Sequence, residues 1–102
     1  MENNKKEEFT RVQRVIDEKY NVIDVNGKLL SNEWFRLAYD FDNGLASVQR
    51  TDGLWNFIDI KGKFLSKEWF NYVHYFQDGY AEVKRTNGEW CKIDKIGKLY
   101  KD

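Results

Sequence analysis

Apolar and polar residues alternate over short segments of the chain, a pattern that predicts half-buried β-strands. In residues 45–50, Ala46, Val48 and Arg50 share one face of an extended segment. Residues 54–60 follow, rich in the aromatic and β-branched side chains that favour a pleated surface. A third, brief segment at residues 63–66 completes a predicted three-stranded antiparallel meander.

Turn-forming residues separate these segments. Asp52-Gly53 follows the first one, and Asn87-Gly88 lies at the same place 35 residues later; both dipeptides favour a type I′ turn. The pattern Asp-x-x-Gly-Lys follows the second segment and occurs at residues 24–28, 59–63 and 94–98. An Asp side chain accepts hydrogen bonds from nearby backbone amides and Gly supplies a positive φ, so these motifs predict tight turns.

The meander recurs with a period of 35 residues. Residues 20–67 and 55–102, aligned without gaps, are identical at 22 of 48 positions. Such a period indicates a repeat architecture. We therefore predict one all-β or mostly β domain, residues 1–102, of three pseudo-repeats at about 9–43, 44–78 and 79–102. Stacking as an open solenoid and closure around a pseudo-threefold axis both fit the sequence.

Two connectors, residues 32–43 and 67–78, join the meanders. Apolar residues in the second connector recur at i, i+1, i+4 and i+7, which favours one or two helical turns: Trp69, Phe70, Val73 and Phe76. We therefore predict short helical or irregular connectors. Alternation over residues 70–76 would also fit a fourth strand, so helix and strand both remain open.

The last repeat is more polar than the second. Lys92 replaces Phe57 and Lys95 replaces Ile60. Terminal units of repeat arrays need a polar outer face. The substitutions therefore predict a capped end and a complete small domain.

Composition narrows the class of protein. The 102 residues contain 17 Lys and Arg and 17 Asp and Glu, so the formal net charge is zero. That balance makes nucleic acid and anionic membrane poor partners, and no apolar run is long enough to cross a bilayer. A single cysteine, Cys91, forms no internal disulfide, and we therefore expect a cytoplasmic location. The oligomeric state does not follow from these counts.

Three segments of the chain together resemble the bacterial WG-repeat family, also described as KWG repeats. They are FDNGLASV at 41–48, GLWNFIDIKGK at 53–63 and FQDGYAEV at 76–83. The resemblance implies a β-rich repeat scaffold, often regarded as an interaction module, without catalytic residues. The chain departs from the family where Asn21, Asn56 and Cys91 replace the glycine that follows the aromatic residue. The family's backbone requirement at that place therefore does not apply here.

Candidate chemistry is sparse. His74 and Cys91 each occur once, and we interpret them as structural, because a nucleophile needs a base within hydrogen-bond reach. One His and one Cys cannot close a zinc site. The carboxylates of Asp24, Asp59 and Asp94 could hold a hard cation, but each stands beside a lysine, so the turn interpretation is favoured. We predict no catalytic residue, no metal and no cofactor.

Aromatic residues divide into two groups. The tryptophans, Trp34, Trp55, Trp69 and Trp90, lie at repeat spacing and are predicted to belong to the core. Those that vary between copies are predicted to be exposed: Phe57, Tyr72, Tyr75 and Tyr80.

The sequence thus predicts a non-enzymatic protein-binding module, with a phage-borne or toxin-linked inhibitor of a larger protein as one form of it. The alternative is carbohydrate or cell-wall polymer binding through exposed aromatic residues. A single partner is best recognised at connector positions that break the repeat, because loops are exposed and Tyr and Arg dominate binding hot spots. These candidates are Arg36, Leu37, Tyr39, Asp40, Asn71, Tyr72, His74 and Tyr75.

Overall fold

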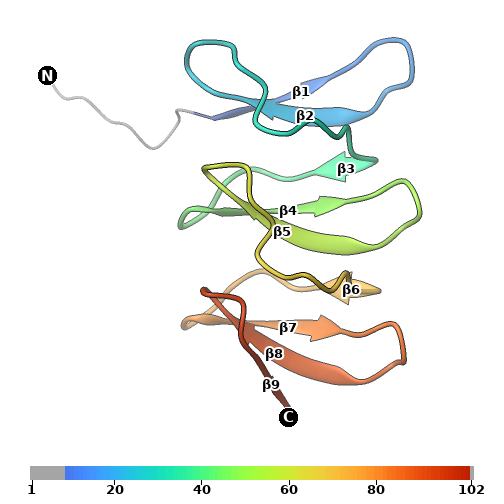
Figure 1. Cartoon of the computed structure of the whole chain (residues 1–102), viewed down its shortest axis with the longest axis vertical. Coiled ribbons are helices and arrows are strands. Elements are labelled where there is room, and N and C mark those ends of the chain that lie inside the picture. Colours follow the sequence, from blue (N-terminus) through green and yellow to red (C-terminus); the bar gives the residue numbers. More distant parts are fainter. Residues whose placement is uncertain (1–8, 102) are drawn as a thin grey trace, which may run out of the picture.

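The computed structural model describes residues 9–101, which contain nine strands and no helix. The strands are β1 (Thr10–Gln13), β2 (Tyr20–Ile23), β3 (Leu37–Ala38), β4 (Leu45–Gln49), β5 (Trp55–Asp59), β6 (Tyr72–Val73), β7 (Tyr80–Lys84), β8 (Trp90–Asp94) and β9 (Leu99–Lys101). They form three antiparallel sheets, β1-β2, β3-β4-β5 and β6-β7-β8-β9, stacked one after another (Figure 1). The all-β prediction is confirmed, and the stack is open rather than a closed ring.

The central hairpins of the second and third sheets have the same register. β4 pairs with β5 from Leu45↔Asp59 to Gln49↔Trp55, and β7 pairs with β8 from Tyr80↔Asp94 to Lys84↔Trp90. Each pair is displaced by 35 residues from its counterpart. The sequence period is therefore reproduced in the backbone pairing of these two hairpins.

Each connector is irregular apart from a two-residue strand, β3 or β6, so the predicted helical turns are wrong and the alternative of a further strand is correct in part. Phe70 pairs backward with Trp55, while the two-residue strand β6 pairs forward with β7. Trp69 packs against Phe64 in one core cluster, whereas Phe70 and Val73 are buried in the other. The spacing that favoured a helix arises because neighbouring connector residues serve two different packing surfaces.

The apolar core lies between the sheets as two clusters. The first is Phe35, Ala38, Ala46, Val48 and Ile58; the second is Leu45, Phe57, Phe70, Val73, Ala81, Val83, Cys91 and Ile93. Phe57 is only 3% exposed, so its predicted exposure is wrong. The prediction that the tryptophans belong to the core is correct only in part. Trp55 and Trp69 are half-buried and pack against the two clusters, whereas Trp34 is half-buried outside them and Trp90 is exposed.

The type I′ turns occur at a different place from the one predicted. Asp52-Gly53 belongs to a three-residue loop in which the N–H of Gly53 donates to the carbonyl of Arg50 (2.9 Å) and only the glycine has positive φ. Type I′ geometry, with positive φ at both central residues, instead occurs at Asn43-Gly44 (56° and 83°) and Asp78-Gly79 (57° and 88°). These turns connect each connector to β4 or β7.

The Asp-x-x-Gly-Lys turns form as predicted. Asp59 Oδ1 accepts hydrogen bonds from the backbone N–H groups of Lys61 and Lys63, both at 2.9 Å. Gly62 has a φ of 85°, and a Cβ there would overlap the carbonyl oxygen of Leu30 in the preceding meander. A Cβ on Gly97 would likewise overlap the carbonyl oxygen of Leu65, so the second and third of these turns also form close contacts with the preceding meander.

Two buried asparagines seal a gap in strand pairing. At the outer edge of β5, Trp55 pairs with Phe70 and Ile58 pairs with Phe64. The residues between Phe64 and Phe70 turn away from β5, which leaves a gap in the backbone pairing. Asn56, fully buried, fills that gap: its Nδ2 donates to the Ser66 carbonyl (2.8 Å) and its Oδ1 accepts from the N–H of Phe57 (2.7 Å). The side chain thus replaces a missing backbone partner.

The same gap exists in the first meander but not in the third. Asn21, also fully buried, donates to the carbonyls of Ser31 (2.9 Å) and Glu33 (3.1 Å). Opposite Cys91, β9 continues in register with β8 and pairs Lys101 with Cys91. A backbone segment therefore occupies the place of the amide, which explains why this position is not asparagine.

Candidate functional site

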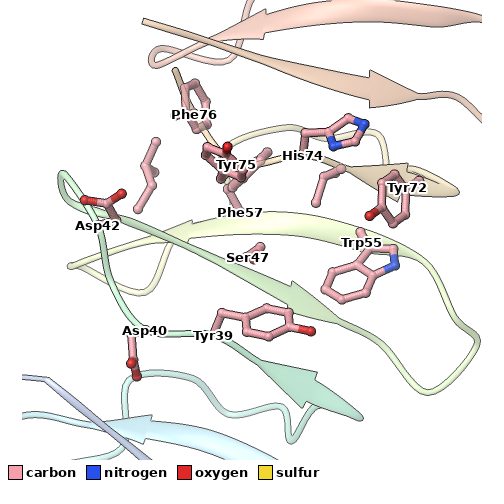
Figure 2. Close-up of a pocket in the computed structure, with 12 residues that line it drawn as sticks. Tyr39, Asp40, Asp42, Ser47, Trp55, Phe57, Tyr72, His74, Tyr75 and Phe76 are labelled. Atoms are coloured by element: carbon pink, nitrogen blue, oxygen red, sulfur yellow. The ribbon is translucent and has the colours of Figure 1, made fainter. Parts of the chain in front are cut away.

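A groove of about 490 Å³ lies between the second and third sheets. Its walls come from the ends of the two connectors and from the facing surface of β4 and β5 (Figure 2). Its lining residues are Tyr39, Asp40, Asp42, Leu45, Ser47, Trp55, Phe57, Tyr72, Val73, His74, Tyr75 and Phe76. The floor is apolar, since Leu45, Phe57 and Val73 belong to the core below it.

Aromatic side chains line one end of this groove. Tyr39 stacks on Trp55, with ring centroids 5.9 Å apart and ring planes inclined by 9°. His74 contacts Tyr72 edge to face at 5.0 Å and stacks on Trp90 at 5.6 Å. These contacts fix the rings relative to one another, so the groove presents a preformed aromatic surface.

Five of the eight candidate residues predicted from the sequence meet at the groove. Tyr39 and Asp40 come from the first connector; Tyr72, His74 and Tyr75 come from the second. The remaining three, Arg36, Leu37 and Asn71, are not among its lining residues. The sequence analysis did not predict that β4 and β5 contribute to the groove. A signal was present, because Leu45 and Ser47 are two residues apart and share one face of β4. Trp55 and Phe57 likewise share one face of β5.

A second groove, of about 460 Å³, adjoins the first. It shares His74 and Tyr75 with the first groove and continues along β7 and β8, and its other lining residues are Gln77, Asp78, Tyr80, Glu82 and Lys92. Tyr75 is 74% exposed and stands where the two grooves meet. The two grooves therefore adjoin at these residues, and we call the lining residues of both grooves together the connector channel.

Carboxylates outnumber basic side chains along the connector channel. Asp40 forms an exposed ion pair with Arg11, at 3.3 Å, and Glu82 lies opposite Lys92 in the β7–β8 register. Within residues 9–101, Asp42 and Asp78 have no ion pair or side-chain hydrogen bond. In the described part of the chain, no paired cation offsets the charge of these two carboxylates.

Outside the channel, the ionisable groups support local structure. Asp94 accepts hydrogen bonds from the N–H groups of Lys98 and Ile96 and from the Tyr100 hydroxyl (2.9 Å). These bonds, the Lys98 amide first, hold the pKa of the Asp94 carboxyl below its usual range. Asp94 therefore belongs to the turn and to the β8–β9 edge.

The two residues considered for nucleophilic chemistry differ in exposure. Cys91 is 2% exposed in the core, whereas the His74 side chain is exposed in the second connector, stacked on Trp90. Among residues 9–101, no group of three His, Cys, Asp or Glu side chains is placed to bind a metal ion. The same residues include no helix able to cross a membrane.

The fold is an open, all-β stack of antiparallel sheets with a groove between neighbouring meanders. Residues 57–90 match the family model of the WG containing repeat. The resemblance expected from the sequence is thereby confirmed across the segment that joins the second meander to the third. No curated protein and no solved structure matches the chain.

Proposed function

We propose that the protein is a non-enzymatic protein-binding module that holds its partner in the connector channel. The observation that supports this most is the gathering of repeat-breaking residues from two connectors at one groove. Tyr39, Tyr72 and Tyr75 are 49%, 46% and 74% exposed there, above an apolar floor. Exposed, preorganised tyrosines are typical of binding hot spots, where truncation costs 2 kcal/mol or more.

The aromatic geometry favours a protein over a carbohydrate. Sugar recognition uses the open face of an aromatic ring as a platform. Here Tyr39 covers a face of Trp55, and His74 covers a face of Trp90. The channel instead offers ring edges and a curved apolar floor, which suit the side chains of a polypeptide.

A more specific form of the proposal concerns the effect of binding on the partner's activity. A small module without catalytic residues acts by occupying a surface, so we propose an inhibitor of a larger protein, phage-borne or toxin-linked, acting in the cytoplasm. The chain has one cysteine, whereas small secreted domains typically have several cysteine pairs, which supports that compartment. A measured loss of the partner's activity when the purified chain is added tests this form.

The test of binding compares two double variants. Affinity capture from the native host first identifies the partner, and calorimetry with the purified partner then measures the affinity of each variant. Tyr72→Ala with Tyr75→Ala removes the exposed rings of the channel. The control, Val25→Ala with Ile96→Ala, removes apolar side chains that are 76% and 85% exposed elsewhere. We expect at least a thirtyfold loss of affinity in the first variant, an unchanged control and equal thermal melts.

Two results would refute the proposal. Equal binding by both variants would place recognition outside the channel. Binding of neutral oligosaccharides that depends on Tyr72 and Tyr75 would favour the carbohydrate alternative.

A further inference from the structure

We infer that the partner segment held in the connector channel is basic, with lysine or arginine side chains directed at Asp42 and Asp78. This inference rests on the proposed function, because it specifies the chemistry of the partner that the channel binds. The protein as a whole has no net charge, so the preference comes from the local arrangement and not from composition.

Both carboxylates are exposed, and both belong to hydrogen-bonded turns. Asp42 lies at the start of the Asn43-Gly44 turn, where its backbone exchanges hydrogen bonds with Leu45 at 2.9 and 3.2 Å. Asp78 is a central residue of the equivalent turn before β7, with a φ of 57°. Because each two-residue turn is closed by a pair of backbone hydrogen bonds, the backbone that carries each charge is preorganised for an incoming cation.

Neither carboxylate is needed to build its turn. Position 78 is occupied by Asn43 in the preceding copy, and position 42 by Gln77 in the following one. Both turns form with a neutral residue at the corresponding place. The two negative charges are therefore available for recognition rather than for folding.

The arrangement of side chains suits a segment that combines a cation with apolar contacts. Figure 2 shows Asp40 and Asp42 toward one side of the groove and Tyr39, Trp55 and Tyr72 toward the other. An arginine or lysine has an apolar stem that can lie on aromatic rings while its charged end reaches a carboxylate. A nucleic acid or another phosphate-bearing partner would instead be repelled by the carboxylates.

The test uses a library of random 12-residue peptides displayed on phage, selected in parallel on three purified proteins. These are the wild type, the channel variant Asp42→Asn with Asp78→Asn, and the control variant Glu18→Gln with Glu33→Gln. The control removes two charges as well, from side chains that line other parts of the surface. All three proteins should have the same thermal melt.

We expect Lys and Arg to exceed Asp and Glu among peptides enriched on the wild type and the control, and this excess to disappear on the channel variant. For one enriched peptide, each neutralised carboxylate should weaken binding by about two- to fivefold at low salt, and less at high salt.

The possible failures are distinguishable. Neutral or acidic peptides that bind and are lost with Tyr72→Ala and Tyr75→Ala would overturn the basic partner and leave the proposed function standing. Basic peptides that bind equally to the channel variant would also overturn the inference. No enrichment on the wild type would count against both the inference and the binding module.

Discussion

The Asp24–Lys28 turn and the Asp59–Lys63 turn have the same local structure but different surroundings. In both, one Asp oxygen accepts two backbone hydrogen bonds at 2.9 Å, and the glycine φ differs by only three degrees, 82° against 85°. A Cβ on Gly27 would meet nothing within 4 Å, whereas one on Gly62 would overlap the Leu30 carbonyl oxygen. The motif therefore fixes the turn, and stacking decides what a substitution there costs.

The largest difference between the two turns should come from their glycines. Gly27→Ala should lower the free energy of unfolding by about 1–2 kcal/mol, because alanine is strained at positive φ. Gly62→Ala should lower it by about 2–4 kcal/mol, since the new methyl group also displaces a backbone carbonyl. Urea melts of the two variants measure the difference. Equal losses would mean that the contact between neighbouring meanders is soft.

The buried amides should behave alike in the first and the middle meander. Asn21→Cys and Asn56→Cys introduce the residue found at position 91 and remove the hydrogen bonds that seal the sheet edge. Each should cost about 1–3 kcal/mol, because a buried backbone carbonyl loses its partner. Denaturant melts measure this loss of unfolding free energy, provided that the m-values of the variants equal that of the wild type. A loss confined to Asn56 would show that water can reach the Asn21 site.

Acid should weaken an ion pair in the turn of the first hairpin. Arg14 bonds Asp17 through two nitrogens at 3.1 and 2.7 Å, which lowers the pKa of the Asp17 carboxyl from 3.8 to about 2. A folded-state pKa below the unfolded one gives stability that is full above pH 3.8 and is lost as the pH falls toward 2. Asp17→Asn should flatten this part of the acid unfolding curve. Carbon-detected NMR titration of Asp17 with a midpoint near 4 would contradict it.

The smallest effects should come from the turn aspartates themselves. Asn can accept the same local hydrogen bonds, so Asp24→Asn and Asp59→Asn should each cost less than about 0.5 kcal/mol. Thermal melts of the pair check both values. A large loss at Asp59 alone would assign its carboxylate a role beyond the turn.

The strands and turns of the hairpins could be predicted because their signals are local. Residues 45–50 and 54–60 were expected as strands, and β4 and β5 occupy Leu45–Gln49 and Trp55–Asp59. The type I′ turn is predicted at Asp52-Gly53 but occurs at Asn43-Gly44. The dipeptides alone do not distinguish the two places, because both favour this type of turn. Only the loop length between paired strands distinguishes them, and that length depends on which residues pair.

The connector and the site were harder to predict for a different reason. Phe70 and Val73 are buried by a neighbouring sheet and Trp69 by another cluster, so their spacing reflects tertiary packing and not a helix. Tyr39 and Tyr75 were correctly expected at the surface, but the groove also needs Trp55 and Asp42 from other segments. No single stretch of sequence contains that arrangement.

The order of the strands has a kinetic consequence. Every strand is bonded only to its neighbours in the chain, and the bridges Tyr20↔Phe35 and Trp55↔Phe70 continue this order across the connectors. Contacts between residues close in sequence are reached by short searches, and such topologies fold fast for all-β proteins. Each meander can therefore pair its own strands early, and the core closes when the following meander packs on it.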